Sequence, residues 1–94
     1  MVYYDMKQYR LVKFEKSTKP NKKYDALIYN KDTDKTVRVS FGDNRYESYQ
    51  DLTGINAYRV HNDKQRRRLY RERHEKEYKY GYFSPSYFSW HYLW

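Results

Sequence analysis

The stretch His61-Asn62-Asp63-Lys64-Gln65-Arg66-Arg67-Arg68-Leu69-Tyr70-Arg71-Glu72-Arg73-His74 decides how the rest of the chain is interpreted. Asn62 or Asp63 can cap a helix here, because a short polar side chain accepts hydrogen bonds from the first free backbone N–H groups. The residues that follow, up to about Lys79, are good helix formers without Gly or Pro, and Gly81 ends the run. The sequence therefore predicts a basic helix over residues 61–80.

This helix holds most of the protein's net positive charge. Residues 64–79 contain eight Lys or Arg and three Glu, a net +5 of the formal +8 of the whole chain. Lys64, Arg67, Arg68 and Arg71 follow the i, i+3, i+4, i+7 spacing of one helical face. Such a face can bind the phosphates of nucleic acid or the carboxylates of a neighbouring protein, or it can be a solvated face that the glutamates partly neutralise. The basic residues predicted to bind a partner are Lys64, Arg66, Arg67, Arg68, Arg71 and Arg73.

The residues before the basic helix alternate between apolar and polar side chains, as β-strands do. The pattern predicts strands over residues 6–16, 24–29 and 35–41, which form a three-stranded antiparallel meander within residues 1–41. In the first strand the alternation assigns Tyr9, Leu11 and Lys13 to one face and Arg10, Val12 and Phe14 to the other. In the second strand it assigns Tyr24, Ala26 and Ile28 to one face and Leu27 and Tyr29 to the other, and in the third strand it assigns Val37, Val39 and Phe41 to one face. The fold class that follows is α+β.

Residues 42–60 form a turn-rich connector between the meander and the basic helix. Gly42 and Gly54 mark its turns, and Tyr46 and Tyr49 have the i, i+3 spacing of a helical turn. We therefore expect one or two helical turns over residues 44–50.

The aromatic tail, residues 81–94, begins with a helix start signal. Ser84 can cap a helix, and Pro85 at the first helical position loses no hydrogen bond. We prefer a short helix to the alternative, a strand. Because so much apolar surface does not stay in water, the tail is expected either to close the domain's own core or to dock into a neighbouring chain. The tail residues predicted to bind a partner are Tyr87, Phe88, Trp90 and Trp94.

Composition limits the class of protein. The chain of 94 residues suffices for one small domain with a thin core, and with 14 Tyr and few aliphatic residues we expect tyrosine to build much of that core. The absence of cysteine excludes disulfides and thiolate metal sites. No apolar run approaches a membrane span, and the first residues lack the segments of a signal peptide. We expect the protein to be kept on the cytosolic or nuclear side of a cell, or packed in a particle assembled there.

Patterns for catalysis or metal binding are weak. His61 and His74 are much further apart than the three or four residues that separate zinc-binding His pairs on a helix, so His61, Asp63 and His74 are interpreted as helix and cap residues. Three carboxylates would hold a divalent cation if they converged, but carboxylates at turns are usually caps; these are Asp43, Glu47 and Asp51. The sequence predicts a protein that is not an enzyme and has no cofactor, metal or small-molecule substrate.

Three blocks, taken together, resemble a known family. They are Phe41-Gly42-Asp43-Asn44-Arg45-Tyr46-Glu47-Ser48-Tyr49-Gln50-Asp51-Leu52-Thr53-Gly54, the stretch from His61 to His74, and Phe88-Ser89-Trp90-His91-Tyr92-Leu93-Trp94. In order and spacing they are similar to a family of small basic, largely uncharacterised proteins of giant DNA viruses, of the chlorella-virus and mimivirus kind. The pattern covers residues 36–94, about two thirds of the chain.

The resemblance implies an origin in a large icosahedral DNA virus, and two roles fit such a chain. The first is a minor capsid protein that cements neighbouring capsid subunits on the inner side of the shell, with the basic helix on acidic patches and the aromatic tail in an apolar seam. The alternative is a sequence-independent DNA-binding protein of the packaged genome. The partners expected are other viral capsid proteins or nucleic acid, and contact with a membrane surface is compatible with the charge. Synthesis would take place in the host cytoplasm or nucleus.

Overall fold

A three-stranded antiparallel meander forms the N-terminal half of the chain, as the sequence predicts. The computed structural model describes residues 4–77 and 81–94. Its elements, in chain order, are β1 Tyr4–Asp5, β2 Tyr9–Lys16, β3 Lys22–Asn30, β4 Thr36–Asp43, α1 Lys64–His74, a 3₁₀ turn at Glu75–Glu77, β5 Tyr82–Phe83, α2 Pro85–Phe88 and a π-helical turn at Ser89–Leu93. The α+β fold class is thereby confirmed. The predicted helical residues 78–80 lie outside the described residues.

The sheet has the order β2-β3-β4, with both strand pairs antiparallel. Tyr24, Ala26 and Ile28 of β3 are fully buried, and Val39 and Phe41 of β4 pack beside them. These residues share the face that their alternation predicts, because successive side chains of a strand point to opposite sides of the sheet. This face is the core side of the sheet.

The predicted faces of β2 are wrong beyond Leu11. The register with β3 shifts between Leu11, which pairs with Ile28, and Lys13, which pairs with Leu27. The extra residue of this β-bulge is Val12, which is 48% exposed. Because the bulge restarts the alternation, Phe14 faces the core together with Tyr9 and Leu11 instead of facing away from them.

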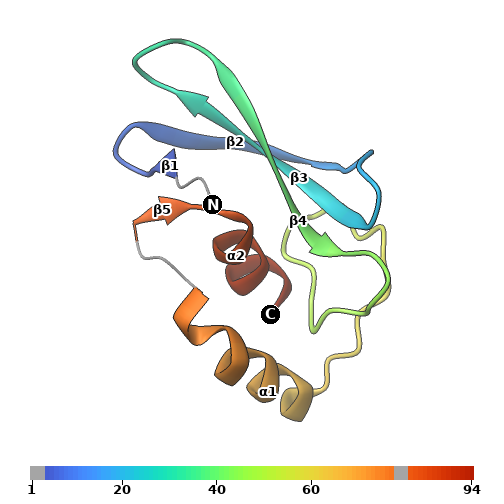
Figure 1. The fold of residues 1–94 in the computed structure, drawn as a ribbon. Coiled ribbons are helices and arrows are strands. Elements are labelled where there is room, and N and C mark those ends of the chain that lie inside the picture. The colour runs from blue at the N-terminus through green and yellow to red at the C-terminus, as the bar shows by residue number, and fades with distance from the viewer. Residues whose placement is uncertain (1–3, 78–80) are drawn as a thin grey trace.

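The C-terminal segment lies between the sheet and α1 (Figure 1). Ser84 caps α2 by accepting a hydrogen bond from the backbone N–H of Tyr87, and Pro85 is the first helical residue, as predicted. Phe88 and Leu93 of this segment are fully buried against the sheet. The tail therefore closes the domain's own core, which was the first of the two expectations for it.

Phenylalanine, more than tyrosine, builds this core. Phe88 contacts the rings of Phe14, Phe41 and Phe83 at centroid distances of 5.9, 5.3 and 5.4 Å. The only fully buried tyrosine of the described residues is Tyr24, whose hydroxyl donates to Asp51 and accepts from the N–H of Ala57. The expectation of a largely tyrosine core is wrong because a buried hydroxyl needs polar partners, which few sites in a small core provide.

The connector between β4 and α1 lies alongside the end of the tail and forms no helix. Its predicted helical turns over residues 44–50 are absent, and a turn at 44–45 stands there instead. The backbone N–H groups of Gln50 and Leu52 donate to the carbonyl groups of Leu93 and Tyr92. The extended backbone is favoured because it satisfies the polar groups at the end of the tail, which a helix of the connector would leave unpaired.

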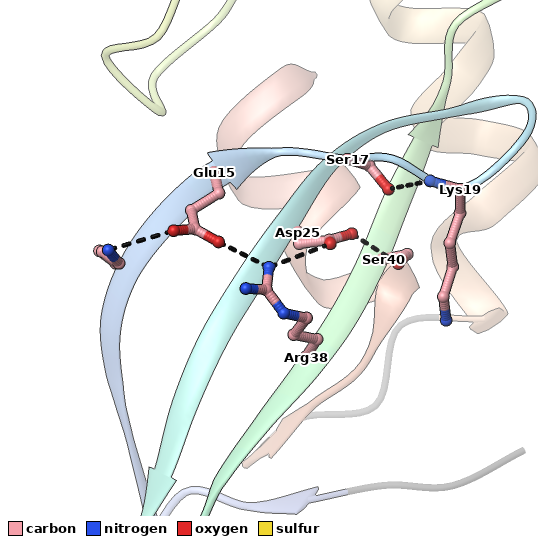
Figure 2. Close-up of polar contacts among 7 residues, drawn as sticks. Glu15, Ser17, Lys19, Asp25, Arg38 and Ser40 are labelled. Carbon is pink, nitrogen blue, oxygen red and sulfur yellow. Dashed lines mark hydrogen bonds and ion pairs between the residues drawn. The ribbon is translucent and has the colours of Figure 1, made fainter.

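The face of the sheet away from the core carries a polar network (Figure 2). The guanidinium of Arg38 donates to Glu15 at 2.6 Å and contacts Asp25 at 3.4 Å, and the hydroxyl of Ser40 donates to Asp25 at 2.6 Å. Asp25 is only 3% exposed. Burial raises the pKa of this carboxyl, but hydrogen bonds from Ser40, Ser17 and Arg38 outweigh that effect and lower it.

Candidate functional site

Helix α1 begins at Lys64 and is capped by Asp63. The carboxylate of Asp63 accepts hydrogen bonds from the N–H groups of Gln65 and Arg66, and the N–H of Asp63 itself donates to Nδ1 of His61 at 2.9 Å. Arg71, Arg73 and His74 occupy the last turn, where positive charge is favourable beside the free carbonyl groups. None of the described side chains of α1 is buried, so little apolar packing holds the helix in place.

The inner face of α1 binds the aromatic tail through cations and rings. Nε of Arg67 donates to the main-chain oxygen of Trp94 at 2.6 Å, and the guanidinium of Arg71 lies 4.5 Å from the ring centroid of Trp90. Tyr70 stacks on Trp94 with a centroid distance of 4.2 Å and an interplanar angle of 4°. These contacts replace the apolar stripe by which an amphipathic helix usually packs.

The predicted basic stripe is therefore divided between two faces. Arg67 and Arg71 lie on the inner face against the tail. The cations of α1 that remain exposed are Lys64, Arg66, Arg68 and Arg73. Within residues 4–77 and 81–94, only Arg68 of these four is in an ion pair, with Glu72 at 3.7 Å.

The four tail residues predicted to bind a partner lie in different surroundings. Phe88 is completely buried in the core, so it cannot contact a partner of the folded domain. Tyr87 packs on Phe83 inside the tail, and Trp90 lies under Arg71. Trp94 is half-buried and also lines an open groove beside α1.

This groove has a volume of about 800 Å³ and three walls. Helix α1 provides one wall, the turn after β4 provides the second, and the C-terminal segment provides the third. Its apolar lining includes Leu69 and Trp94, and its rim carries the cations Lys22, Arg66 and Arg73. Arg66, Arg73 and Trp94 are thus brought together as predicted partner-binding residues.

Two carboxylates also line the groove, and each is bound by its own arginine. Asp43 accepts two hydrogen bonds from the guanidinium of Arg45, at 3.0 and 2.8 Å, and this arginine lowers the pKa of Asp43 to about 2. Glu47 lies 3.6 Å from Arg59. Because both negative charges are compensated locally, the groove offers a positive rim to a ligand.

The residues considered as metal ligands have other contacts. Asp51 accepts from Tyr24 and from Thr53, while Asp43 and Glu47 pair with the arginines described above. In the part of the chain that the structure describes, no three His, Asp or Glu residues are grouped so that they could hold a metal ion. No described helix is long and apolar enough to cross a membrane.

Sequence reasoning missed several residues of this surface. Lys22, Tyr46 and Leu69 line the groove, and Lys23 is buried next to it, where its ammonium donates to Ser48 at 2.6 Å. Burial lowers the pKa of Lys23, against the opposing effect of nearby carboxylates. Of these residues, only Leu69 could have been identified from the sequence, because it is an apolar residue within the basic helix.

No family model matches the chain, and no curated protein and no solved structure matches it.

Proposed function

We propose that this protein is a binding protein without enzymatic activity, and that the exposed face of α1 binds the phosphate backbone of nucleic acid independently of sequence. One observation carries the proposal: of the six Lys and Arg residues in α1, two hold the helix on the tail and four extend into solvent. The helix of 11 residues is about 16 Å long, so its cations extend over roughly five base-pair steps of a duplex.

The aromatic tail does not favour a cementing role in the capsid over a DNA-binding role. Its expected function in the capsid was to fill an apolar seam within the domain or between chains. Phe88 and Leu93 fill such a seam inside the domain. The aromatic content is thus explained by the core, and the feature left for a partner is positive charge, which phosphates match.

The resemblance to proteins of giant DNA viruses supports a virion as the setting. In that setting the protein accompanies the packaged genome inside the capsid shell. Each contact of a basic side chain with a phosphate releases counterions, which favours binding, and a neutralised phosphate repels neighbouring DNA strands less.

The minor capsid protein is the second candidate, and Leu69 favours it. This side chain is 46% exposed in the middle of the cationic helix. A protein neighbour would cover an apolar group in such a place, whereas a phosphate contact makes no use of it. In this role Arg66, Arg68 and Arg73 bind carboxylates of adjacent capsid subunits.

A salt titration tests the first proposal. Affinity for DNA should fall with salt, with a slope in the double-logarithmic plot of about −0.9 per phosphate neutralised. The double variant Lys64→Ser, Arg68→Ser should reduce that slope by about two. The matched control is Lys31→Ser, Lys35→Ser at the exposed β3–β4 turn, which should change the slope less. Equal effects of both pairs would contradict a binding face on α1.

Fractionation of particles separates the two candidates. Virions are opened gently, shell and DNA core are separated, and the chain is located by mass spectrometry. Release from the DNA fraction by salt supports the genome-binding role. Retention with the shell at a fixed ratio to the major capsid protein supports the cementing role instead.

A further inference from the structure

Tyr46 is the most exposed large apolar side chain of the described residues, at 67%, and it lines the groove beside α1. The guanidinium of Arg45 lies 5.8 Å from its ring centroid. The other aromatic rings of the groove are engaged within the protein: Tyr70 stacks on Trp94, and His74 lies 4.2 Å from Tyr70. Tyr46 is therefore the ring with a surface available to a ligand.

Three cations line the same groove as this ring. Lys22 comes from the start of β3, and Arg66 and Arg73 come from α1. The volume of about 800 Å³ is within the range of sites that hold small organic ligands. An exposed aromatic ring beside a line of cations is the arrangement by which proteins hold single strands, with bases on the rings and phosphates on the cations.

We infer that the groove binds single-stranded nucleic acid in preference to duplex, with an unstacked base against Tyr46 and adjacent phosphates at Lys22, Arg66 and Arg73. This inference rests on the proposed function, because the strand would pass from the groove onto the exposed face of α1. A duplex keeps its bases stacked inside, so it can reach the cations but cannot place a base in the groove.

The combination of ring and charge distinguishes this partner from an acidic peptide. Carboxylates would pair with Arg66 and Arg73 but would not require a stacking surface. Each base stacked on an aromatic ring adds affinity, and it does so for every base type because every base has a π-face. The groove accordingly adds selectivity for single strands over duplex, and it adds no selectivity for base sequence.

The test compares a short oligo-dT with a hairpin duplex of equal phosphate number, at one salt concentration, by fluorescence anisotropy. Wild-type protein should bind oligo-dT more tightly than duplex. Tyr46→Ala should weaken oligo-dT binding by about tenfold and leave duplex binding within about twofold. Tyr46→Phe, which keeps the ring, should retain the wild-type preference. Circular dichroism verifies that each variant is folded.

Fluorescence provides a second measurement, because the chain has two tryptophans and Trp94 lines the groove. In Trp90→Phe, oligo-dT should change the emission of Trp94 more than duplex does. The inference is overturned if single strand and duplex bind equally, if Tyr46→Ala has no effect, or if polyglutamate of equal charge displaces oligo-dT as well as DNA does. Failure of the proposed function itself appears differently, as no salt-dependent binding to either form of DNA.

Discussion

Nε of Arg67 donates a hydrogen bond of 2.6 Å to the main-chain oxygen of Trp94, and the same guanidinium lies 4.9 Å from the ring centroid of Tyr49. One side chain thus connects α1, the tail and the connector. Arg67→Ala should lower the free energy of unfolding by about 1.5–3 kcal/mol, because a charged hydrogen bond and a cation–π contact are lost together. Urea denaturation measures the change. Arg68→Ala on the exposed face is the control and should shift stability by less than about 0.5 kcal/mol.

Acidification should destabilise the protein through His61. Its Nδ1 accepts the N–H of the cap residue Asp63, which requires an unprotonated nitrogen. Burial, followed by the positive charge of Arg66, lowers the pKa of His61. The unfolded chain therefore binds a proton more readily, so stability is fully present above the unfolded pKa of about 6.5 and is lost as the pH falls below it.

The urea midpoint of wild type should consequently decrease between about pH 7.5 and about pH 5. His61→Asn retains an acceptor for the Asp63 N–H but does not titrate, so the same pH change should lower its midpoint less. His91, whose pKa is also lowered by burial and by Arg71, contributes to the remaining dependence. A pH response of His61→Asn as large as that of wild type would contradict this role of His61.

Asp25, on the face of the sheet away from the core, should contribute more to the free energy of unfolding than its neighbour Glu15. Asp25→Asn removes a buried charged acceptor from Ser40 and Arg38, so it should cost about 1–3 kcal/mol at neutral pH. Since the folded pKa of Asp25 is lowered, its contribution is present above the unfolded value of 3.8 and is lost as the pH falls through the folded one. The difference between wild type and Asp25→Asn should shrink in acid.

The matched control for this prediction is Glu15→Gln, at the more exposed end of the same network. It should have little effect on the urea midpoint, because solvent screens the pair that Glu15 forms with Arg38. Equal losses from the two variants would show that burial of Asp25 is not the reason for its importance.

Two glycines allow a test of the close packing around Gly42, which lines the groove. Gly42 and Gly54 both have positive φ, +76° and +85°, so alanine costs about 1–2 kcal/mol of backbone strain at either position. At Gly42 an added Cβ would also lie 2.9 Å from Leu93 and 3.1 Å from Cβ of Lys23, whereas nothing lies within 4 Å at Gly54. Gly42→Ala should therefore reduce the thermal midpoint further than Gly54→Ala, and equal reductions would contradict the close approach.

The strands and the tail helix could be predicted because short-range chemistry determines them. Alternation predicts which residues share a face in β3 and in β4, and Ser84 with Pro85 determines the start of α2. The bulge in β2 could not be predicted, because alternation places Val12 and Phe14 on one face and both are apolar, so the sequence pattern does not separate them. Only the pairing with β3 exposes Val12 and packs Phe14 against the core.

The candidate site was less predictable, because spacing along α1 fits two faces equally. Lys64, Arg67, Arg68 and Arg71 form one face, and Arg67, Tyr70, Arg71 and His74 form another that overlaps it. The aromatic tail selects the second face for packing, and this selection depends on residues more than 15 positions away. The spacing of Tyr46 and Tyr49 predicts a helical turn, and this prediction gives no indication that Tyr46 lines the groove.

The position of the C-terminal segment between the sheet and α1 has a consequence for biosynthesis. The core face of the meander is complete once residue 43 has been made, but Phe88 and Leu93 of the C-terminal segment are among the side chains that bury it. A nascent chain on the ribosome therefore exposes an apolar sheet with unpaired edge strands until the last of these residues emerges. A chain interrupted before residue 88 would not mature into a folded domain and would be a substrate for proteolysis.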